Sequence, residues 1–382
     1  MAAAKVILYV LAFLTTTTAS WAFETLARNA LVYDVQTGTT LLSKDAVRPM
    51  PPASMSKLMT LNMLFEALRD GRVALDTKFS VSEKAHKMGG SKMFLRQGER
   101  VSVDDLIKGI IIQSGNDACV VVAEGLNGSE AEFARKMTER AKKLGMNNSS
   151  FANATGWPHP GQRMSAEDLV ILANRLITEF PEYYPYFAEE SFTWANIAQN
   201  NRNPLLKLGI GADGLKTGHT EEAGYGLVGS AVQGDRRVIF VVSGLGSSAQ
   251  RANEAERMVN WAFRNFVRKE FAEKDAVIGT ADVWLGRKDK VELYSQKDIT
   301  ALLPYDAVDS FKASIKYTGP LEAPIAKDAQ IATLVLEADG VDPTEYPLFA
   351  KTDVRKGGLL SRMKVSAEKL KDEIIGGSGS DR

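Results

Sequence analysis

Cysteine is almost absent from this chain, since Cys119 is the only one among its 382 residues. An intramolecular disulfide is therefore excluded, and stability in an oxidising compartment has to come from packing. Cys119 lies in the apolar stretch 118–123, which favours a small buried hydrophobic side chain. A catalytic thiol is the alternative, but it requires a nearby base, and the neighbouring residues in the sequence supply none.

The chain also has few histidines and no net charge. The three histidines, His86, His159 and His219, form no HExxH or other metal-ligand spacing, so neither a metallopeptidase nor any metal or other cofactor is expected. Basic and acidic residues number 47 each, so the basic excess of a nucleic-acid-binding protein is missing. His159 follows a turn at 153–158 and is interpreted either as a cleft residue or as a structural residue of its loop.

The apolar run near the N-terminus, residues 6–14, is far shorter than the about 20 residues that a membrane-spanning helix needs. It follows Lys5 and precedes Ser20-Trp21-Ala22, which offers small residues at the cleavage positions of an export signal. Residues 1–22 are therefore predicted to be a signal peptide, whose removal leaves Phe23 first. An uncleaved membrane anchor is the alternative.

Three short motifs follow one another along the chain: Ser54-Met55-Ser56-Lys57, Ser114-Gly115-Asn116 and Lys216-Thr217-Gly218. A serine and a lysine three residues apart on a helix share one face, so the Lys57 amine can take the proton of the Ser54 hydroxyl. The apolar spacing over 55–68 places Ser54 at a helix N-terminus, where free N–H groups favour a developing oxyanion. The same SxxK spacing recurs at Ser361 and Ser366, in a charged stretch without downstream partners, and indicates ordinary helix-surface residues.

The other two motifs complete an acyl-transfer site. Ser114, on a turn between helices, can pass a proton between Lys57 and a leaving amine, because a hydroxyl both donates and accepts. Asn116 offers an amide that can bind a substrate peptide group. Lys216 supplies positive charge at the end of an edge strand, and either burial or this neighbouring charge would keep Lys57 neutral.

Three further groups are predicted around the same cleft. Thr217 contributes a hydroxyl, and Gly218 allows a ligand to approach the backbone closely. The backbone N–H groups of Ser54 and His219 are predicted to form the oxyanion hole. Arg251 is a candidate partner for a substrate carboxylate, because a guanidinium binds a carboxylate bidentately, and a structural role for it is equally open.

The periodicity along the chain predicts an α/β sandwich with an inserted helical lobe, followed by a small all-β domain and a terminal amphipathic helix. Helices are expected over 55–68, 103–126 with a break at 113–116, 131–143, 166–179 and 252–269. Strands are expected over 31–34 and 37–42, which form a hairpin, and over 225–231 and 237–243. The predicted division of the chain is a signal peptide at 1–22, a catalytic domain at 23–270, a β-rich domain at 271–357 and an amphipathic helix at 358–376. The last segment is interpreted either as a partner-packing or solvated helix or as one that lies on a membrane surface.

The motifs, together with Pro51-Pro52-Ala53, Asp117-Ala118, the Gly89-Gly90-Ser91 loop and His219-Thr220, resemble those of the penicillin-binding D-alanyl-D-alanine carboxypeptidases. These enzymes are low-molecular-mass relatives of the serine β-lactamases. The resemblance implies removal of the terminal D-alanine from peptidoglycan pentapeptide stems in the bacterial periplasm, through an acyl-serine at Ser54. It also implies acylation of this serine by β-lactams, and attachment to the outer face of the inner membrane through the C-terminal helix.

Three other functions stay open at this stage. A serine β-lactamase would need a deacylating base, and no ExxLN element lies between Asn116 and Lys216. A DD-endopeptidase acting on cross-linked stems would use the same chemistry. A non-catalytic wall-binding scaffold is disfavoured, because the nucleophile, base and oxyanion elements are all present.

Overall fold

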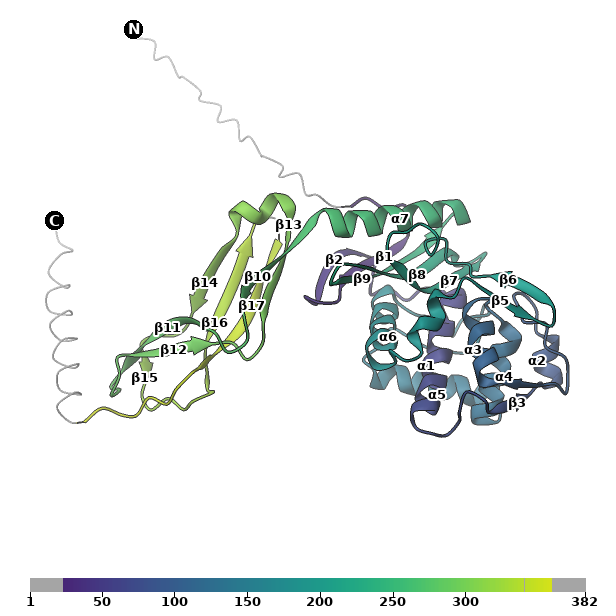
Figure 1. Ribbon diagram of the computed structural model, residues 1–382, viewed down its shortest axis with the longest axis horizontal. Coiled ribbons are helices and arrows are strands. Elements are labelled where there is room, and N and C mark those ends of the chain that lie inside the picture. The colour runs from purple at the N-terminus through teal and green to yellow at the C-terminus, as the bar shows by residue number, and fades with distance from the viewer. Residues whose placement is uncertain (1–22, 340, 359–382) are drawn as a thin grey trace, which may run out of the picture.

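The computed structural model describes residues 23–339 and 341–358 (Figure 1). The predicted signal peptide and all but the first residue of the predicted terminal helix lie outside these residues. The chain forms two units, a larger α/β unit and a smaller all-β unit, and they are joined where helix α7 (Ser248–Arg264) leads into strand β10 (Phe266–Ala272). The predicted fold class is thereby confirmed for the described part of the chain.

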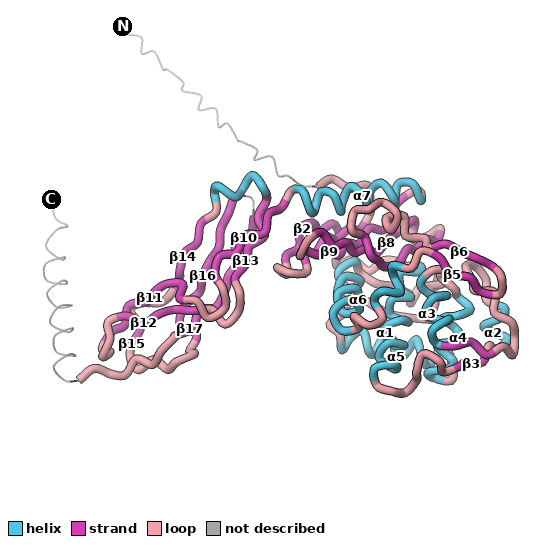
Figure 2. The backbone as a smooth tube through the Cα atoms, in the orientation of Figure 1, coloured by secondary structure: helices cyan, strands magenta, loops and turns pink. Residues whose placement is uncertain are grey.

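A five-stranded antiparallel sheet divides the larger unit into two layers (Figure 2). Its strands, in spatial order, are β2 (Thr39–Lys44), β1 (Asn29–Asp34), β9 (Arg236–Leu245), β8 (Gly224–Gln233) and β7 (Ala212–Thr220). Ile239 and Val241 of β9 join the core under the helical lobe, whereas Phe240 and Val242 join the core under α7. This alternation follows from the two-residue period of a strand and buries both faces of β9.

The helical lobe packs on one face of this sheet. It comprises α1 (Lys57–Arg69), α2 (Glu83–Lys87), α3 (Val103–Ile111), α4 (Asn116–Asn127), α5 (Glu130–Lys143) and α6 (Ala166–Glu179). Three of the longer helices begin where a serine accepts a hydrogen bond from a backbone N–H of the first turn, namely Ser102, Ser129 and Ser165. Two small hairpins, β3–β4 (Lys78–Ser80, Arg100–Ser102) and β5–β6 (Ser191–Trp194, Ile197–Asn200), flank the lobe, and the sequence did not predict them.

The smaller unit is all β apart from the 3-10 helix η3 (Tyr305–Ser310). Its six-stranded sheet has the order β14 (Lys312–Lys316), β16 (Gln330–Ala338), β17 (Val341–Ala350), β12 (Lys290–Tyr294), β11 (Val277–Trp284) and β15 (Leu321–Glu322). Strand β10 pairs separately with β13 (Ile299–Pro304). The unit has a hydrophobic core of its own, with Leu293, Leu334 and Leu348 at its centre.

One predicted element is wrong at its end. The helix expected over 252–269 stops at Arg264, and Phe266 begins strand β10. Phe263 and Phe266 continue the helical spacing of apolar residues, but pairing of Val267 with Leu303 of β13 overrides that local pattern. Strand β10 therefore runs across the predicted domain limit between residues 270 and 271.

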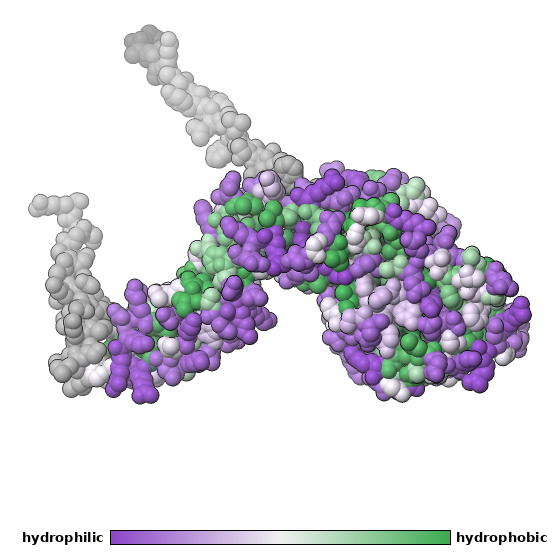
Figure 3. Space-filling view, viewed as in Figure 1, coloured by the Kyte–Doolittle hydropathy of each residue, from purple (hydrophilic) through white to green (hydrophobic). Residues whose placement is uncertain are grey.

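On the face shown in Figure 3, hydrophilic residues cover most of both units and the hydrophobic areas are small and separate. Among the described helices, none is both long and apolar enough to cross a bilayer.

Candidate active site

Ser54 and Lys57 are in contact at the start of the first helix of the lobe. Ser54 lies in a 3-10 turn, η1 (Ala53–Ser56), and Lys57 is the first residue of α1. The Lys57 amine is fully buried and lies 2.8 Å from Ser54 Oγ. The three-residue spacing thus brings base and hydroxyl together on one face, as the helical period requires.

A loop from outside the three motifs holds the Lys57 amine in place. Lys57 Nζ donates to the carbonyl of Thr155 at 2.5 Å. Asn153 Oδ1 accepts from the N–H groups of Thr155, Gly156 and Trp157, at 3.1, 2.8 and 3.1 Å, and so fixes the turn that presents this carbonyl. The sequence marked 153–158 as a turn but did not assign Asn153 or Thr155 to the site.

Gly156 brings this loop against the nucleophile turn. Its φ of +84° is in the left-handed region, and a Cβ atom at this position would lie 1.9 Å from the carbonyl oxygen of Ala53. Only glycine permits this approach without a shift of one backbone segment. The loop and the turn that carries Ser54 are therefore in direct backbone contact.

Ser114 and Lys216 form the second pair of the site, although 102 positions separate them in the sequence. Ser114 lies between α3 and α4 with a φ of 58°, an uncommon conformation for a residue with a side chain. Lys216 extends from the edge strand β7, and its Nζ donates to Ser114 Oγ at 3.0 Å and to the Thr217 carbonyl at 3.3 Å. Both side chains are buried.

Burial dominates the electrostatics of the two lysines. The pKa of the Lys57 amine falls from 10.5 to about 8, because burial disfavours the charged form and the Arg202 guanidinium adds to this effect, while Cys119 and Asp117 oppose it. Burial, followed by repulsion from Lys57, also lowers the pKa of Lys216 well below its usual range. The sequence left burial or a neighbouring cation such as Lys216 as the cause of a neutral Lys57 amine; burial is the largest cause of its lowered pKa, and Arg202 is a cation that adds to it.

Asn116 and Asp117 connect α4 to the Gly89-Gly90-Ser91 loop. The Asn116 amide donates to the Gly89 carbonyl at 2.8 Å, and its backbone N–H donates to the Ser91 carbonyl at 2.8 Å. The buried Asp117 carboxylate accepts from the N–H groups of Met93 at 2.9 Å and Leu95 at 3.1 Å. These bonds fix the wall of the cleft opposite β7.

Gly218 lies where strand β7 meets the nucleophile turn. A Cβ atom on Gly218 would lie 3.0 Å from the Pro52 carbonyl oxygen and 3.1 Å from Met55 Cγ. Gly218 therefore lets strand β7 pack closely against the nucleophile turn, and the approach of a ligand to its backbone stays a prediction. Thr217, beside it, is buried.

His219, Tyr225 and Arg251 form a row at the end of β7. The His219 ring stacks on Tyr225 with ring centroids 3.9 Å apart, and the Arg251 guanidinium lies 5.8 Å from the centre of the same tyrosine ring. The Nε atom of Arg251 is buried and has no hydrogen-bond partner among the described residues. The contact of the Arg251 guanidinium with a substrate carboxylate stays a prediction.

Arg202 is a residue of the site that the sequence did not reveal. Its Nη1 donates to Ser91 Oγ at 2.6 Å, which places its charge over the cleft. Nothing in its local sequence distinguishes it, because its function depends on a contact across 111 positions.

Cys119 is a buried structural residue, whereas His159 closes a turn and also lines a surface groove with Gly89 and Thr155. Cys119 is buried, and burial raises the pKa of its thiol to about 12, which removes the reactive thiolate. His159 is exposed, and its Nδ1 accepts from the N–H of Gly161 at 3.0 Å, which closes the turn.

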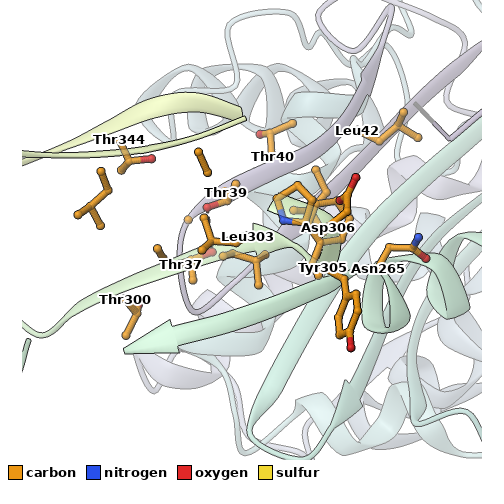
Figure 4. A pocket seen from close by; sticks show the side chains of 18 of the residues that line it. Thr37, Thr39, Thr40, Leu42, Asn265, Thr300, Leu303, Tyr305, Asp306 and Thr344 are labelled. Atoms are coloured by element: carbon orange, nitrogen blue, oxygen red, sulfur yellow. Dashed lines mark hydrogen bonds between the residues drawn. The ribbon is translucent and has the colours of Figure 1, made fainter. Parts of the chain in front are cut away.

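In the part of the chain that the structure describes, no group of three or more His, Cys, Asp and Glu side chains is placed to hold a metal ion. A cavity of about 780 Å³ between the two units, lined by Thr39, Trp261, Leu303 and Tyr305 among others, contains none of the motif residues (Figure 4). The chemistry is therefore assigned to the motif residues that meet between η1, α4 and β7, and not to this cavity.

Comparison with known proteins agrees with this geometry. A family model described as D-alanyl-D-alanine carboxypeptidase matches residues 15–247, and one described as the C-terminal domain of penicillin-binding protein 5 matches residues 266–356. The D-alanyl-D-alanine carboxypeptidase DacF of Bacillus subtilis is 37% identical over 344 residues, which cover 88% of each chain.

Two solved structures are similar. Penicillin-binding protein 5 from Haemophilus influenzae has a TM-score of 0.78 and 33% identity, covering 87% of this chain and 98% of its own. Penicillin-binding protein D2 from Listeria monocytogenes, in its ampicillin-bound form, has a TM-score of 0.58 and 32% identity, covering 63% of this chain and 99% of its own. The chain belongs to the D-alanyl-D-alanine carboxypeptidase family of penicillin-binding proteins, peptidase family S11.

Proposed function

We propose that this protein is a serine-type D-Ala-D-Ala carboxypeptidase that removes the terminal D-alanine from peptidoglycan pentapeptide stems through an acyl-enzyme on Ser54. The observation that carries the proposal is the 2.8 Å contact between Ser54 Oγ and the fully buried amine of Lys57. With a pKa of about 8, this amine is partly neutral near neutral pH and available as a base.

Acylation starts when neutral Lys57 takes the Ser54 proton and Ser54 Oγ attacks the carbonyl of the penultimate D-alanine. The peptide bond breaks, the acyl group stays on Ser54, and the leaving amine receives a proton through Ser114. Water then hydrolyses the ester, releasing the shortened stem and returning the proton to Ser54. Because Lys216 Nζ donates to Ser114 Oγ, the Ser114 O–H group is left to donate its own proton toward the leaving amine.

Substrate orientation follows from the charges of the cleft. The carboxylate of the terminal D-alanine is assigned to the side of Lys216, Thr217 and Arg251, because a guanidinium binds a carboxylate bidentately. The N–H groups of Ser54 and His219 are assigned to the oxyanion, whose stabilisation typically contributes several kcal/mol in such sites.

β-Lactams are proposed to acylate the same serine, since the related Listeria protein was solved in ampicillin-bound form. Endopeptidase action on cross-linked stems remains a second activity of the same chemistry. Fast hydrolysis of the acyl-enzyme would instead make the protein a β-lactamase.

We further propose that the protein is exported and acts in the periplasm, peripherally on the outer face of the inner membrane. The signal-like residues 1–22 and the amphipathic pattern from Leu359 onward support this location. N-terminal sequencing of the protein from a periplasmic extract tests it, and a first residue other than Phe23 would contradict the predicted cleavage.

The decisive experiment is Ser54→Ala. The variant should lose both D-alanine release from a pentapeptide and covalent labelling by fluorescent penicillin, while its far-UV circular dichroism stays unchanged. Ser361→Ala, which alters a second SxxK match, is the matched control and should label normally. If the Ser54→Ala variant is still labelled, Ser54 is not the nucleophile and the assignment is wrong. Loss of the label from the wild-type protein within seconds would favour a β-lactamase.

A further inference from the structure

The cavity between the two units has a wall of aromatic rings. Phe23 packs on Trp261 with ring centroids 5.2 Å apart, and Trp261 meets Phe266 edge-on at 5.0 Å. Tyr305 lines the same cavity from the smaller unit and is 74% exposed. Its backbone is nevertheless held, because its N–H donates to the Asn265 carbonyl at 2.9 Å. Aromatic rings from both units therefore border one partly open space of about 780 Å³.

Free polar side chains lie among these rings. Figure 4 shows threonine side chains at this cavity that come from three segments, namely 37–40, β13 and β17. The hydroxyl groups of Thr40, Thr300 and Thr344 have no hydrogen-bond partner among the described residues. The same holds, within the described part of the chain, for the Tyr305 phenol and the Asn265 side-chain amide. Because hydroxyl and amide groups both donate and accept, the cavity can satisfy a ligand that is rich in such groups.

The charges at the cavity narrow the class of ligand. Among the described residues that line it, only Arg264 and Asp306 carry charge, and the two are of opposite sign. A strongly anionic or cationic ligand therefore has no matching field there. An uncharged pyranose ring fits better, because its C–H faces are attracted by the negative face of an aromatic ring and its edges carry hydroxyl and amide groups.

The cavity and the catalytic cleft lie at opposite ends of the same sheet and the same helix. Strand β2, which lines the cavity, and strand β7, which carries Lys216, are the two outer strands of the five-stranded sheet. At about 4.8 Å between neighbouring strands, they are about 19 Å apart. Along α7, Arg251 lies beside the cleft and Arg264 at the cavity, and the helix rises about 20 Å between them. A ligand in the cavity is therefore well separated from Ser54, on the Arg251 side of the cleft.

We propose that this cavity is a second binding site, which takes the uncharged N-acetylated pyranose rings of a peptidoglycan glycan strand. The inference rests on the proposed function, in which the substrate is a stem carried on such a strand. Because the cavity lies on the side of the leaving D-alanine, the strand that it holds is a neighbour of the strand whose stem is cleaved. Holding that neighbour raises the effective concentration of stems at Ser54 without adding a group to the reaction.

Two substrates with the same stem separate the cavity from the cleft. One is a free pentapeptide, and the other is a glycan strand that carries this pentapeptide. Tyr305→Ala should lower kcat/KM for the glycan-linked stem by about fivefold, the size expected for one aromatic contact, and change that for the free pentapeptide by less than about twofold. Tyr305→Phe keeps the ring and should retain most of the rate on the glycan-linked stem.

Val277→Ala is the matched control, because Val277 is another exposed apolar residue of the smaller unit, at 47%, and does not line the cavity. It should change kcat/KM for neither substrate. Equal effects of Tyr305→Ala on the two substrates, or no effect on either, would overturn the glycan site. The second result would leave the cavity to another occupant, such as an apolar segment of a partner protein.

Direct binding provides a test that does not depend on catalysis. The probe is a fluorescent glycan strand from which an amidase has removed the stems, so that nothing in it fits the cleft. Its fluorescence polarisation should rise with the wild-type protein, and Tyr305→Ala should weaken the binding about fivefold. Absence of binding to the wild-type protein would overturn the glycan site alone. Absence of D-alanine release from either substrate would instead overturn the proposed function, while the stem-free strand still shows whether the cavity binds glycan.

Discussion

At the scale of single residues, Gly156 provides a sharp test of how the site is assembled. Gly156 and Gly145 have nearly the same backbone conformation, with φ of +84° and +83°. A Cβ atom on Gly156 would collide with the Ala53 carbonyl and lie 2.6 Å from Ser56 Oγ, whereas one on Gly145 would meet nothing within 4 Å. The pair therefore separates the cost of left-handed backbone from the cost of losing the loop contact.

Both Gly156→Ala and Gly145→Ala should lose about 1–2 kcal/mol of unfolding free energy from backbone strain. Gly156→Ala should lose more than this, and its acylation by penicillin should slow at least about tenfold, because the Thr155 carbonyl moves away from the Lys57 amine. Urea unfolding and stopped-flow acylation measure the two effects. Equal acylation rates in the two variants would show that the loop does not position the base.

The protonation of Lys57 predicts the pH profile of acylation. Its pKa, lowered from 10.5 to about 8 by burial, means that the amine is protonated, and inactive as a base, below that value. The rate constant should therefore rise about tenfold per pH unit below pH 8 and level off above it. Lys216 of β7, Asp117 and Cys119 of α4, and Arg202 are the titratable or charged groups that act on this amine.

Arg202→Gln removes a cation that lowers the Lys57 pKa, so the midpoint of the profile should move to higher pH. Arg135→Gln, at an exposed arginine on α5, should leave the midpoint in place. A midpoint that does not respond to Arg202→Gln would remove Arg202 from the electrostatics of the site.

At the scale of elements, α4 and the loop before it act as one piece. The Asp117 carboxylate accepts N–H bonds from Met93, Leu95 and Ala118, all inside the protein. Asp117→Asn puts an NH₂ group opposite at least one of these donors, and a buried polar group without its partner costs about 1–3 kcal/mol. We expect that loss in urea unfolding, whereas Asp76→Asn, at an exposed aspartate, should change stability by less than about 0.5 kcal/mol. Equal stability of the two variants would contradict this account of the loop.

The sequence predicts those parts of the site that depend on local geometry. The contact between Ser54 and Lys57 follows from the helical period, and the cap at Ser165 follows from a serine before an apolar periodic run. The break between α3 and α4 is visible as Gln113-Ser114-Gly115-Asn116, because these residues favour turns.

Contacts between segments that are distant in the chain could not be predicted from the sequence. Lys57 meets the Thr155 carbonyl across 98 positions, and a backbone carbonyl has no residue type that could mark it. The helix expected to reach residue 269 ends early because the pairing of β10 with β13 depends on strands that follow later in the chain. Local periodicity carries no information about either contact.

At the scale of the whole molecule, the two units have separate cores. The cores of the larger unit include no residue beyond Phe263, and the core of the smaller unit begins at Phe271. The links between the units include a bond from Arg236 to the Phe266 carbonyl, a bond from the Tyr305 N–H to the Asn265 carbonyl, and the ion pair between Arg268 and Asp235. Such links resemble a modest domain interface rather than one continuous core.

The larger unit should therefore acylate without the smaller one. A chain of residues 23–265 should react with fluorescent penicillin within about threefold of the full-length rate, because every group assigned to the site lies at or before Arg251 and the Listeria structure covers only 63% of this chain. A chain ending at residue 270 should label equally but aggregate more, since residues 266–270 of β10 would lose their partner strand β13 and present an unpaired edge. If residues 23–265 fold, by circular dichroism, but do not label, the smaller unit contributes to the site, and the separation of chemistry from the β domain is wrong.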